Sequence, residues 1–349
     1  MAIETARKNV ADLIGADPTE IIFTSCGSES NNFAIKGIAK AYEKKGKHII
    51  TSTIEHFSVL YPLKGLEKEG FKVTYLPVDN FGFIDPQRVY EALTPETILV
   101  TLTHASNEIG TIERIEEIGA IVKAHDVIFH VDAVQTAGTI PVMVDHLKVD
   151  ALTLAANQFY GPTGVAALYV RKGVKIAPLI LGGIQEEGRR AGTPNLLGIV
   201  GMGKAAELAK EEMEERNKKL IRLRDKLLKG LLEEIDEFFI TGHPNQRLPG
   251  HVSGYAKYVE GESMSMLLNL EGVAVSTGSA CVSKALKASH VLLAIGVSPE
   301  DVHGSLVFSL GKDNSEEDVD YVLDKLPAIV KRLRKMSPLG GNNYGKRKI

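Results

Sequence analysis

The sequence has little cysteine, no tryptophan and no surplus of basic residues. Its 349 residues include two cysteines, which are too few to staple a small secreted fold and are typical of a reducing compartment. The formal net charge of −3 offers no basic surface for nucleic acid. The chain also lacks an apolar run of the roughly 20 residues that span a bilayer. We therefore expect a cytoplasmic protein with neither nucleic acid nor membrane as a partner.

Short runs rich in β-branched residues alternate with helical patterns in the first half of the chain. This alternation predicts a three-layer α/β/α fold with a mostly parallel mixed sheet. Ligands on such sheets bind at the carboxyl ends of the strands. The expected strands are 20–24, 47–51, 72–77, 97–102, 127–132, 151–155 and 164–170.

A long, strongly charged helical pattern over 196–234 separates this region from the rest of the chain. Beyond it, the run GVAVST at 272–277 predicts a strand, and the pattern at 316–336 predicts a helix. The sequence thus favours a large domain followed by a small α+β domain and a flexible tail. The expected bounds of these three parts are 1–241, 242–337 and 338–349.

Several positions at strand ends suit a bound ligand. Gly27 and Ser28 open a helical pattern directly after the first strand, and a helix N-terminus offers free N–H groups to a phosphate. Ser28 has the alternative of a plain N-cap. His56 follows the second strand, where a histidine is usually structural. Asp132 ends the fifth strand, where a carboxylate acts as a cap, a metal ligand or an ion-pair partner.

Longer motifs carry a family resemblance. The runs VDAVQ at 131–135 and LTLAANQFYGPTGVAALYV at 152–170 resemble the core of the class V aminotransferases, and within them the cysteine desulfurases of the NifS/IscS type. The segment AVSTGSACVSK at 274–284 is similar to the loop that bears the desulfurase nucleophile. The resemblance implies an aspartate-aminotransferase-like large domain, pyridoxal phosphate as the cofactor and L-cysteine as the substrate. It also implies that the family has a further segment upstream of Met1.

The resemblance assigns roles around the cofactor. Asp132 pairs with the pyridine nitrogen and makes the ring an electron sink, while His56 stacks on the ring. Gln135 contacts the ring hydroxyl, and Asn107 matches the asparagine of the family's N-N-E-I-G motif. Thr193 matches a threonine that reaches the phosphate in the other subunit, which implies a homodimer with shared sites. The full set of expected cofactor-binding residues is Gly27, Ser28, His56, Asn107, Asp132, Gln135, Gln158 and Thr193.

Cys281 lies in the nucleophile loop. In the family's chemistry a mobile thiolate takes the sulfur of cysteine and becomes a persulfide, and glycine and serine neighbours fit a loop that has to move. The alternative is an inert small residue in a polar turn. A thiolate also suits iron, so Cys281 is the candidate for sharing a [2Fe-2S] cluster with an IscU-like scaffold protein. Cys26 replaces a glycine of the family, and we expect it to be a small buried side chain.

Four departures from the family concentrate on the cofactor and the substrate. Gln158 stands where the family has the lysine that holds pyridoxal phosphate as a Schiff base, and an amide cannot form an imine. Asn157 replaces the adjacent histidine, and Ala155 replaces a phosphate-binding serine. Val307 stands where the family has the arginine that binds the substrate carboxylate. We therefore expect pyridoxal phosphate to bind without a covalent bond.

Two interpretations follow from a pocket that lacks its lysine. In the first, the chain is a weak or inactive desulfurase that serves iron–sulfur cluster assembly as a dimeric partner and relays sulfur through Cys281. In the second, it is a slow desulfurase that uses pyridoxal phosphate or its pyridoxamine form non-covalently. A class V aminotransferase of other specificity, such as a selenocysteine lyase, is a third alternative, but the STGSAC run favours the NifS/IscS branch.

Overall fold

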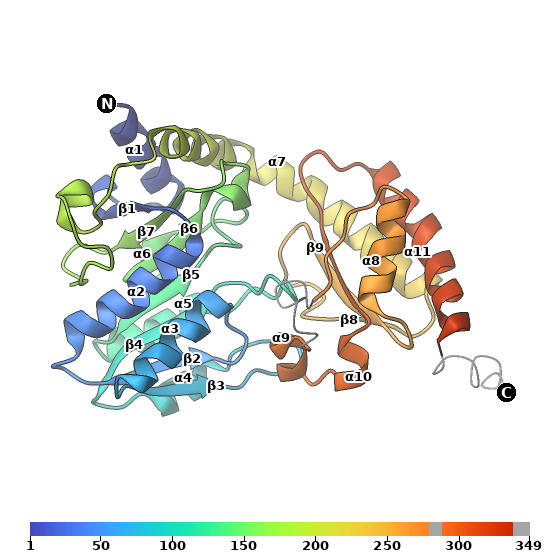
Figure 1. Ribbon diagram of the computed structural model, residues 1–349, viewed down its shortest axis with the longest axis horizontal. Helices are drawn as coiled ribbons and strands as arrows, with labels where there is room; N and C mark the ends of the chain where they lie inside the picture. The colour runs from blue at the N-terminus through green and yellow to red at the C-terminus, as the bar shows by residue number, and fades with distance from the viewer. Residues whose placement is uncertain (279–287, 338–349) are drawn as a thin grey trace. The chain divides into compact units, whose positions relative to one another are not determined.

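The structure, a computed structural model, describes residues 1–278 and 288–337 (Figure 1). The chain folds into two compact units. The first comprises 1–78, 83–106 and 112–214, and the second comprises 79–82, 107–111 and the chain from 215 onward.

The division between the units lies inside one long helix, α7 (Leu196–Glu234). The sequence predicts a boundary after residue 241, whereas the two compact units divide between residues 214 and 215. The physical reason is the apolar face of the second half of α7. Its side chains Leu223, Leu227 and Leu231 are buried in the hydrophobic core of the second unit.

A seven-stranded sheet forms the centre of the first unit, in the order β1-β7-β6-β5-β4-β2-β3. The pairs β2–β3, β2–β4, β4–β5 and β5–β6 are parallel, and β7 runs antiparallel to both β6 and β1. The predicted mostly parallel mixed sheet is therefore confirmed. The strands are β1 (Ile21–Thr24), β2 (His48–Ser52), β3 (Lys72–Leu76), β4 (Thr97–Thr103), β5 (Ile128–Asp132), β6 (Ala151–Ala155) and β7 (Ala166–Val170).

Helices cover both faces of this sheet, because successive strand residues point to opposite sides. One face packs against α1, α5 and the start of α7 through residues such as Val10, Ile118 and Met202. The other packs against α2 and α3 through Phe33 and Val59, and Figure 1 shows these two helices over the sheet. The helices are α1 (Ala2–Ile14), α2 (Gly27–Tyr42), α3 (Phe57–Lys68), α4 (Pro86–Ala92), α5 (Ile115–Ala124) and α6 (Val144–Leu147), with 3-10 turns η1 (Pro18–Glu20), η2 (Ala156–Phe159) and η3 (Gln185–Gly188).

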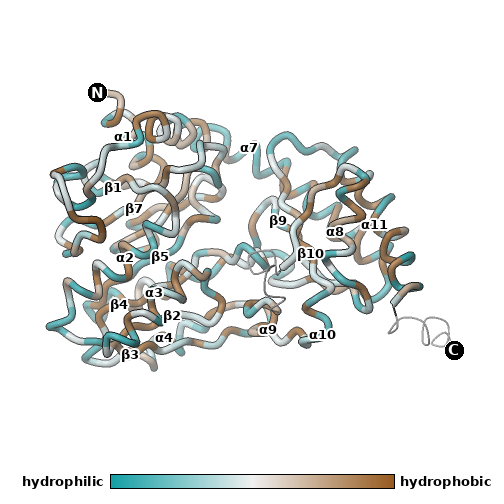
Figure 2. The backbone as a smooth tube through the Cα atoms, viewed as in Figure 1, coloured by the Kyte–Doolittle hydropathy of each residue, from teal (hydrophilic) through white to brown (hydrophobic). Residues whose placement is uncertain are grey.

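The second unit contains an antiparallel sheet in the order β10-β9-β8. The helix predicted at 316–336 is confirmed as α11, which Ser315 and Asp318 begin with a capping box. Brown and teal stretches alternate along α11 in Figure 2, as expected for a helix with one buried face. The remaining elements are β8 (Phe238–Ile240), β9 (His251–Ala256), β10 (Ser305–Ser309), α8 (Gly261–Leu270), α9 (His290–Ala294), α10 (Pro299–Val302) and α11 (Glu316–Met336).

The strand predicted at 272–277 is wrong. This segment makes only an isolated antiparallel bridge, in which Ser276 and Val307 exchange two backbone hydrogen bonds of 3.1 and 2.7 Å. Its β-branched residues instead serve as packing: Val273 and Val275 lie partly buried against the core of the second unit. No helix in the described ranges is both long and apolar enough to cross a membrane.

Candidate active site

Most of the residues expected around the cofactor follow strands of the first unit. The strands β1, β2, β5 and β6 run in one direction, so their carboxyl ends meet at one edge of the sheet. Ser28 comes after β1, His56 after β2, Gln135 after β5 and Gln158 after β6. This is the edge at which parallel sheets bind ligands.

Asp132 is the last residue of β5, and its side chain is buried. Its Oδ2 accepts a hydrogen bond of 2.7 Å from Nδ2 of Asn31, and its Oδ1 accepts one of 3.0 Å from the N–H of Val134. Burial raises the pKa of the Asp132 carboxyl, while the Val134 and Asn31 donors and the charge of His56 oppose that rise. The carboxylate is thus held at the sheet edge by two donors of its own unit.

Asn31 extends this network toward His56. Its Nδ2 also donates to Oγ of Ser58 at 2.8 Å, and Ser58 Oγ lies 2.7 Å from Nδ1 of His56. The backbone N–H of Ser58 donates to the same Nδ1 at 3.1 Å, which makes His56 the N-cap of α3 and places its proton on Nε2. The imidazole is exposed. A continuous chain of polar contacts therefore joins the expected ring-stacking residue to the expected pyridine partner.

Sequence reasoning missed Asn31. It lies within SESNN in the second turn of α2, where an asparagine normally belongs on the exposed face. Its position in the helical repeat could have indicated burial, because residues 30, 31, 34 and 38 fall on the buried side of the helix. Asn31 Oδ1 is itself buried without a hydrogen-bond partner in the described part of the chain.

The N-terminus of α2 is built to approach the sheet closely. A Cβ on Gly27 would lie 2.9 Å from Cγ2 of Val134, so the first residue of the helix has no room for a side chain. The N-cap residue Cys26 makes no side-chain cap hydrogen bond, and Ser28 is exposed in the first turn. The helix start therefore presents uncapped N–H groups and a hydroxyl, which suit an anion.

The expectation that Cys26 is buried is wrong, because its side chain is exposed. As the N-cap residue, Cys26 has an extended backbone, with φ −167° and ψ 165°. Packing of the helix start against β5 and β6 falls on the next residue, Gly27, whose Cα faces Val134 and Ala155. The side chain one position earlier is left toward solvent.

Thr193 belongs to a segment anchored on the exit of β1. Arg190 forms an ion pair of 2.8 Å with Glu29 of α2, and Thr193 lines a small pocket together with Phe23, Thr24 and Ser25. The expected phosphate-contacting threonine is exposed. In a homodimer such a position is open to a second subunit.

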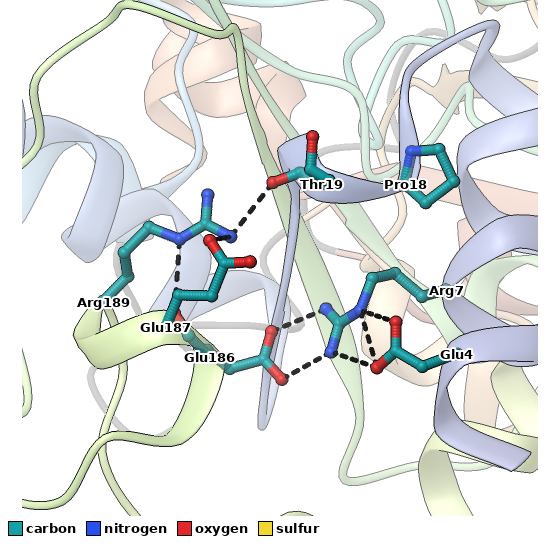
Figure 3. A pocket seen from close by; sticks show the side chains of 7 residues that line it. All are labelled: Glu4, Arg7, Pro18, Thr19, Glu186, Glu187 and Arg189. Carbon is teal, nitrogen blue, oxygen red and sulfur yellow. Dashed lines mark hydrogen bonds and ion pairs between the residues drawn. The ribbon is translucent and has the colours of Figure 1, made fainter. Parts of the chain in front are cut away.

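A second pocket contains the ion pair that holds residues 186–189, which precede Thr193 in the chain (Figure 3). Arg7 of α1 forms an ion pair of 2.7 Å with Glu186, whose Oε2 also accepts the N–H of Phe23 at 2.9 Å. Glu186 and Glu187 both have positive φ angles, 47° and 58°, which non-glycine residues rarely adopt. The buried ion pair holds this strained turn in place.

Four loops at the carboxyl edge of the first unit contain no lysine. Gln158 lies in η2 directly after β6, and its side chain is exposed, as is that of Asn157. Lys172 follows β7, which is antiparallel, so it lies at the opposite edge, where its N–H donates to Glu20 ahead of β1. The segments that follow β1, β2, β5 and β6 contain no lysine; they are 25–26, 53–56, 133–143 and 156–165.

The remaining expected residues lie in the second unit or outside the description. Asn107 belongs to the second unit, where it is half-buried and its carbonyl accepts a hydrogen bond of 3.0 Å from Nε2 of His251. Val307 is buried in β10 at 7% exposed. Cys281, expected as nucleophile and iron ligand, lies outside the described residues. Within them, no three His, Cys, Asp or Glu side chains are arranged to hold a metal ion.

These residues fit pyridoxal phosphate in part. A buried carboxylate at a strand end suits a pyridine N–H, an uncapped helix start suits a phosphate, and an exposed imidazole is available for stacking. The covalent anchor has no counterpart, because the edge that would supply it is free of lysine at 25–26, 53–56, 133–143 and 156–165. The geometry therefore fits the cofactor as a non-covalent ligand.

Comparison with known proteins places these features in a family. The model of the family "Aminotransferase class-V" matches residues 1–322. The cysteine desulfurase IscS of Methanosarcina thermophila is 54% identical over 343 residues, which cover 98% of this chain and 85% of the relative. The IscS of Dictyoglomus turgidum is 54% identical over 337 residues, 97% of this chain and 86% of the relative.

Solved structures agree with the sequence matches. A NifS-like protein superimposes with a TM-score of 0.89 at 41% identity, covering 95% of this chain and 88% of the other. The apo cysteine desulfurase of Thermococcus onnurineus gives a TM-score of 0.85 at 29% identity, covering 95% and 84%. The fold is thus that of the desulfurase structures over nearly the whole chain.

Proposed function

We propose that this chain, which belongs to the class-V aminotransferase family as a cysteine desulfurase of the NifS/IscS type, is a weak or inactive member that serves iron–sulfur cluster assembly as a dimeric partner and sulfur relay. The observation that carries this proposal is the lysine-free carboxyl edge around Gln158. An enzyme that needs an amine at this edge, both to anchor its cofactor and to move a proton, has none there.

Pyridoxal phosphate is the cofactor of this family, and it supplies an electron sink when bound. In this chain Asp132 would hold the ring nitrogen, while Asn31 keeps the carboxylate oriented through its 2.7 Å hydrogen bond. The start of α2 at Gly27 and Ser28 would hold the phosphate, with the hydroxyl of Ser28 as a further donor. These contacts are reversible, so the cofactor should exchange with solvent.

The missing groups act on successive parts of the reaction. A positioned acid–base group is worth about 10²–10⁴ in rate, and the amide of Gln158 supplies none of it. An apolar Val307 in place of a charge-assisted carboxylate contact loses roughly 1.5–3 kcal/mol of binding. Because the losses fall on different steps, they compound, and we propose that turnover of L-cysteine is slow or absent.

The assembly role depends on features that need no lysine. We propose that the chain is a cytoplasmic homodimer in which Thr193 reaches across to the other subunit. Cys281 would carry sulfur as a persulfide, or ligate a [2Fe-2S] cluster shared with an IscU-like scaffold protein. The likeness to proteins named IscS supports this role, since the match extends over 98% of this chain.

A second candidate is a functional desulfurase with non-covalent pyridoxal phosphate or its pyridoxamine form. The observation that favours it is the intact chain of contacts from Asp132 through Asn31 and Ser58 to His56. A protein that retains this many groups for the ring has kept the means to bind it. The two candidates differ in turnover, and the same assay separates them.

The assay is the release of alanine and sulfide from L-cysteine with added pyridoxal phosphate. Wild type should remain near the rate of free cofactor. Gln158→Lys should raise the rate by at least 10², and adding Val307→Arg should lower KM further. Asn157→Lys, which places an amine one residue away in the same turn, is the control and should stay near wild type. A wild type as fast as the double variant would reject the weak or inactive assignment and establish the second candidate.

Sulfur relay is tested apart from catalysis. A persulfide donor is supplied, and transfer of sulfur to a co-purified scaffold protein is followed by mass spectrometry. Cys281→Ala should abolish transfer while dimerisation persists, because the dimer does not need the sulfur atom. Cys26→Ser is the matched control and should transfer normally. Equal transfer by Cys281→Ala and wild type would remove the relay from the proposal.

A further inference from the structure

Arg247 of the second unit is a buried cation that contacts no carboxylate of residues 1–278 and 288–337. It is 2% exposed, and only Nη2 of its guanidinium has partners. These are the carbonyl of Ile109 at 3.1 Å, Oγ of Ser253 at 3.0 Å and Nδ1 of His251 at 3.3 Å, all of them neutral acceptors. Nε and Nη1 are buried without a hydrogen-bond partner in the described part of the chain. Several donors of a charged group are thus left unused.

The surroundings of Arg247 compensate its charge only in part, because Asp225, whose charge raises the pKa of Arg247, is itself paired with Arg224. The neighbouring Arg224 is also buried but pairs with Asp225 at 2.8 Å. Burial first, and then the charge of Arg224, lower the pKa of Arg247 to about 10, which still leaves it protonated near pH 7. Burial also lowers the pKa of His251, to about 3, so that ring is neutral. A buried unpaired cation is costly, and proteins normally supply a partner for it.

The imidazole of His251, which contacts the guanidinium, is closely packed against the backbone of residues 107–110. The carbonyl of Asn107 accepts from Nε2 of His251 at 3.0 Å, and Gly110, with φ 75°, brings the same segment against the ring. A Cβ on Gly110 would lie 2.4 Å from Nδ1 of His251, so a side chain there would displace the histidine. The segment 107–111 and Arg247 are therefore held together by specific contacts, and the cation is preorganised.

Arg247 also lies near Val307, the position at which the family resemblance expects an arginine that binds the substrate carboxylate. In the register of β9 and β10, Ser253 lies directly opposite Val307, so their side chains are on the same face of the sheet. Ser253 Oγ is the acceptor for Nη2 of Arg247. The guanidinium is thus bound one strand away from Val307, where the family resemblance expects a carboxylate-binding arginine.

We propose that Arg247 is an anion-binding residue of the second unit and that it takes the carboxylate of a small amino acid. One uncompensated charge is balanced by a monoanion, which favours a carboxylate over a phosphate or sulfate dianion. A planar guanidinium matches a carboxylate in geometry as well as charge. The identification of the ligand as an amino acid rests on the proposed function. The preference of the site for a monocarboxylate does not depend on it.

The test is direct binding by the full-length protein without added cofactor. L-alanine, acetate, chloride and sulfate are titrated at constant ionic strength, and binding is measured by calorimetry and by the thermal unfolding midpoint. We expect saturable binding of L-alanine and acetate, with L-alanine tighter, and no saturable binding of chloride or sulfate. Arg247→Met should weaken carboxylate binding by about 10- to 100-fold.

Arg222→Met is the matched control, because Arg222 lies in the same unit on the surface of α7, with its side chain 69% exposed. It should bind carboxylates like wild type. Should Arg247→Met fail to fold, Arg247→Lys keeps the charge but loses the planar fork, and it should still bind at least tenfold more weakly. Wild-type affinity in the folded Arg247 variant would overturn the proposal, as would equal saturation by chloride. Acetate bound as tightly as L-alanine would keep the site but reject the amino acid.

The experiments distinguish failure of the anion site on Arg247 from failure of the proposed assembly role. Carboxylate binding is measured without pyridoxal phosphate, so its absence leaves the assembly role of the chain untouched. Conversely, rapid desulfuration by wild type would reject the weak or inactive assignment while leaving an anion site on Arg247 in place.

Discussion

Asp132 in the first unit and Arg247 in the second are both charged side chains that are almost fully buried, at 6% and 2% exposed. Asp132 receives two hydrogen bonds from its own unit, one from the side-chain amide of Asn31 and one from the backbone N–H of Val134. Arg247 has partners on a single nitrogen, and all three are neutral. Asp132 is thus satisfied by donors of its own unit, whereas Arg247 contacts no charged partner among the described residues.

The two residues lie in units with different expected roles: the first unit carries the residues expected to bind the cofactor, and the second carries the position expected to bind the substrate. The groups expected around the ring of the cofactor remain in the first unit and support one another through hydrogen bonds. In the second unit Val307 stands where the resemblance expects a substrate-binding arginine, and Arg247, one strand away, contacts no carboxylate in the described part of the chain. The proposed function therefore predicts that substrate binding is weakened more than cofactor binding in this chain.

The largest expected effect is the pH dependence of stability caused by Glu55, a second buried acid of the first unit. Its Oε1 accepts from Ser52 Oγ at 2.6 Å and from the N–H of Thr103 at 3.0 Å. Burial raises its pKa from 4.5 to about 8, and the charge of Asp132 adds to the rise. The folded state therefore keeps a proton that the unfolded state has released, so this contribution to stability is lost as the pH rises from 4.5 to 8.

We expect Glu55→Gln to remove that pH dependence. Relative to the variant, wild type should lose a few kcal/mol of unfolding free energy between the two pKa values, as measured by urea denaturation at a series of pH values. Glu69→Gln, an exposed acid at the end of α3, is the control and should keep the wild-type slope. Parallel slopes for wild type and Glu55→Gln would show that the first unit carries two buried charges, and the contrast with Arg247 would fail.

A smaller effect is expected from the partners of the two charges. Asn31→Ala leaves Asp132 with one donor and should cost about 1.5–3 kcal/mol of unfolding free energy. Arg247→Met removes a cation that has no anion, so without added carboxylate it should be neutral or stabilising. Asn32→Ala, in which only a local bond to the Ser28 carbonyl is lost, should cost less than Asn31→Ala. An Arg247→Met variant destabilised as much as Asn31→Ala would mean that both charges are equally well satisfied.

The smallest effect concerns Cys26 at the start of α2. In a Cys281→Ser background, alkylation of the exposed Cys26 should slow by a few fold when pyridoxal phosphate occupies the helix start. Chloride at the same ionic strength is the control and should leave the rate unchanged. An unchanged rate under conditions where absorbance shows the cofactor bound would place the phosphate away from Gly27 and Ser28.

Much of the fold was predictable because hydrophobic periodicity determines which segments enter the sheet. All seven expected strands of the first unit are present, and Asp132 lies at the predicted end of β5. Tertiary packing decided what the sequence could not show. Cys26 is exposed because Gly27 takes the contact with the sheet, and 272–277 is not a strand because Ser276 forms an isolated bridge with Val307 of β10 and not a continuous ladder.

The polar partners were harder to predict than the strands. Asn31 and Asp132 are far apart in sequence, as are Arg247 and Ile109, and nothing local marks either pair. A single asparagine on a helix or a single arginine in a loop has an ordinary exposed alternative. Only the assembled fold shows that both are buried and that one has a charged partner while the other has none.

Borohydride reduction shows whether the first unit binds pyridoxal phosphate without a covalent bond, because it traps a Schiff base as a stable amine. The protein is incubated with pyridoxal phosphate, reduced, digested and analysed by mass spectrometry, alongside Gln158→Lys. Wild type should carry no label on any residue of 150–175 and should lose the cofactor on dialysis, while Gln158→Lys should be labelled stoichiometrically at position 158. Stoichiometric labelling of a lysine in 150–175 of wild type would contradict the account.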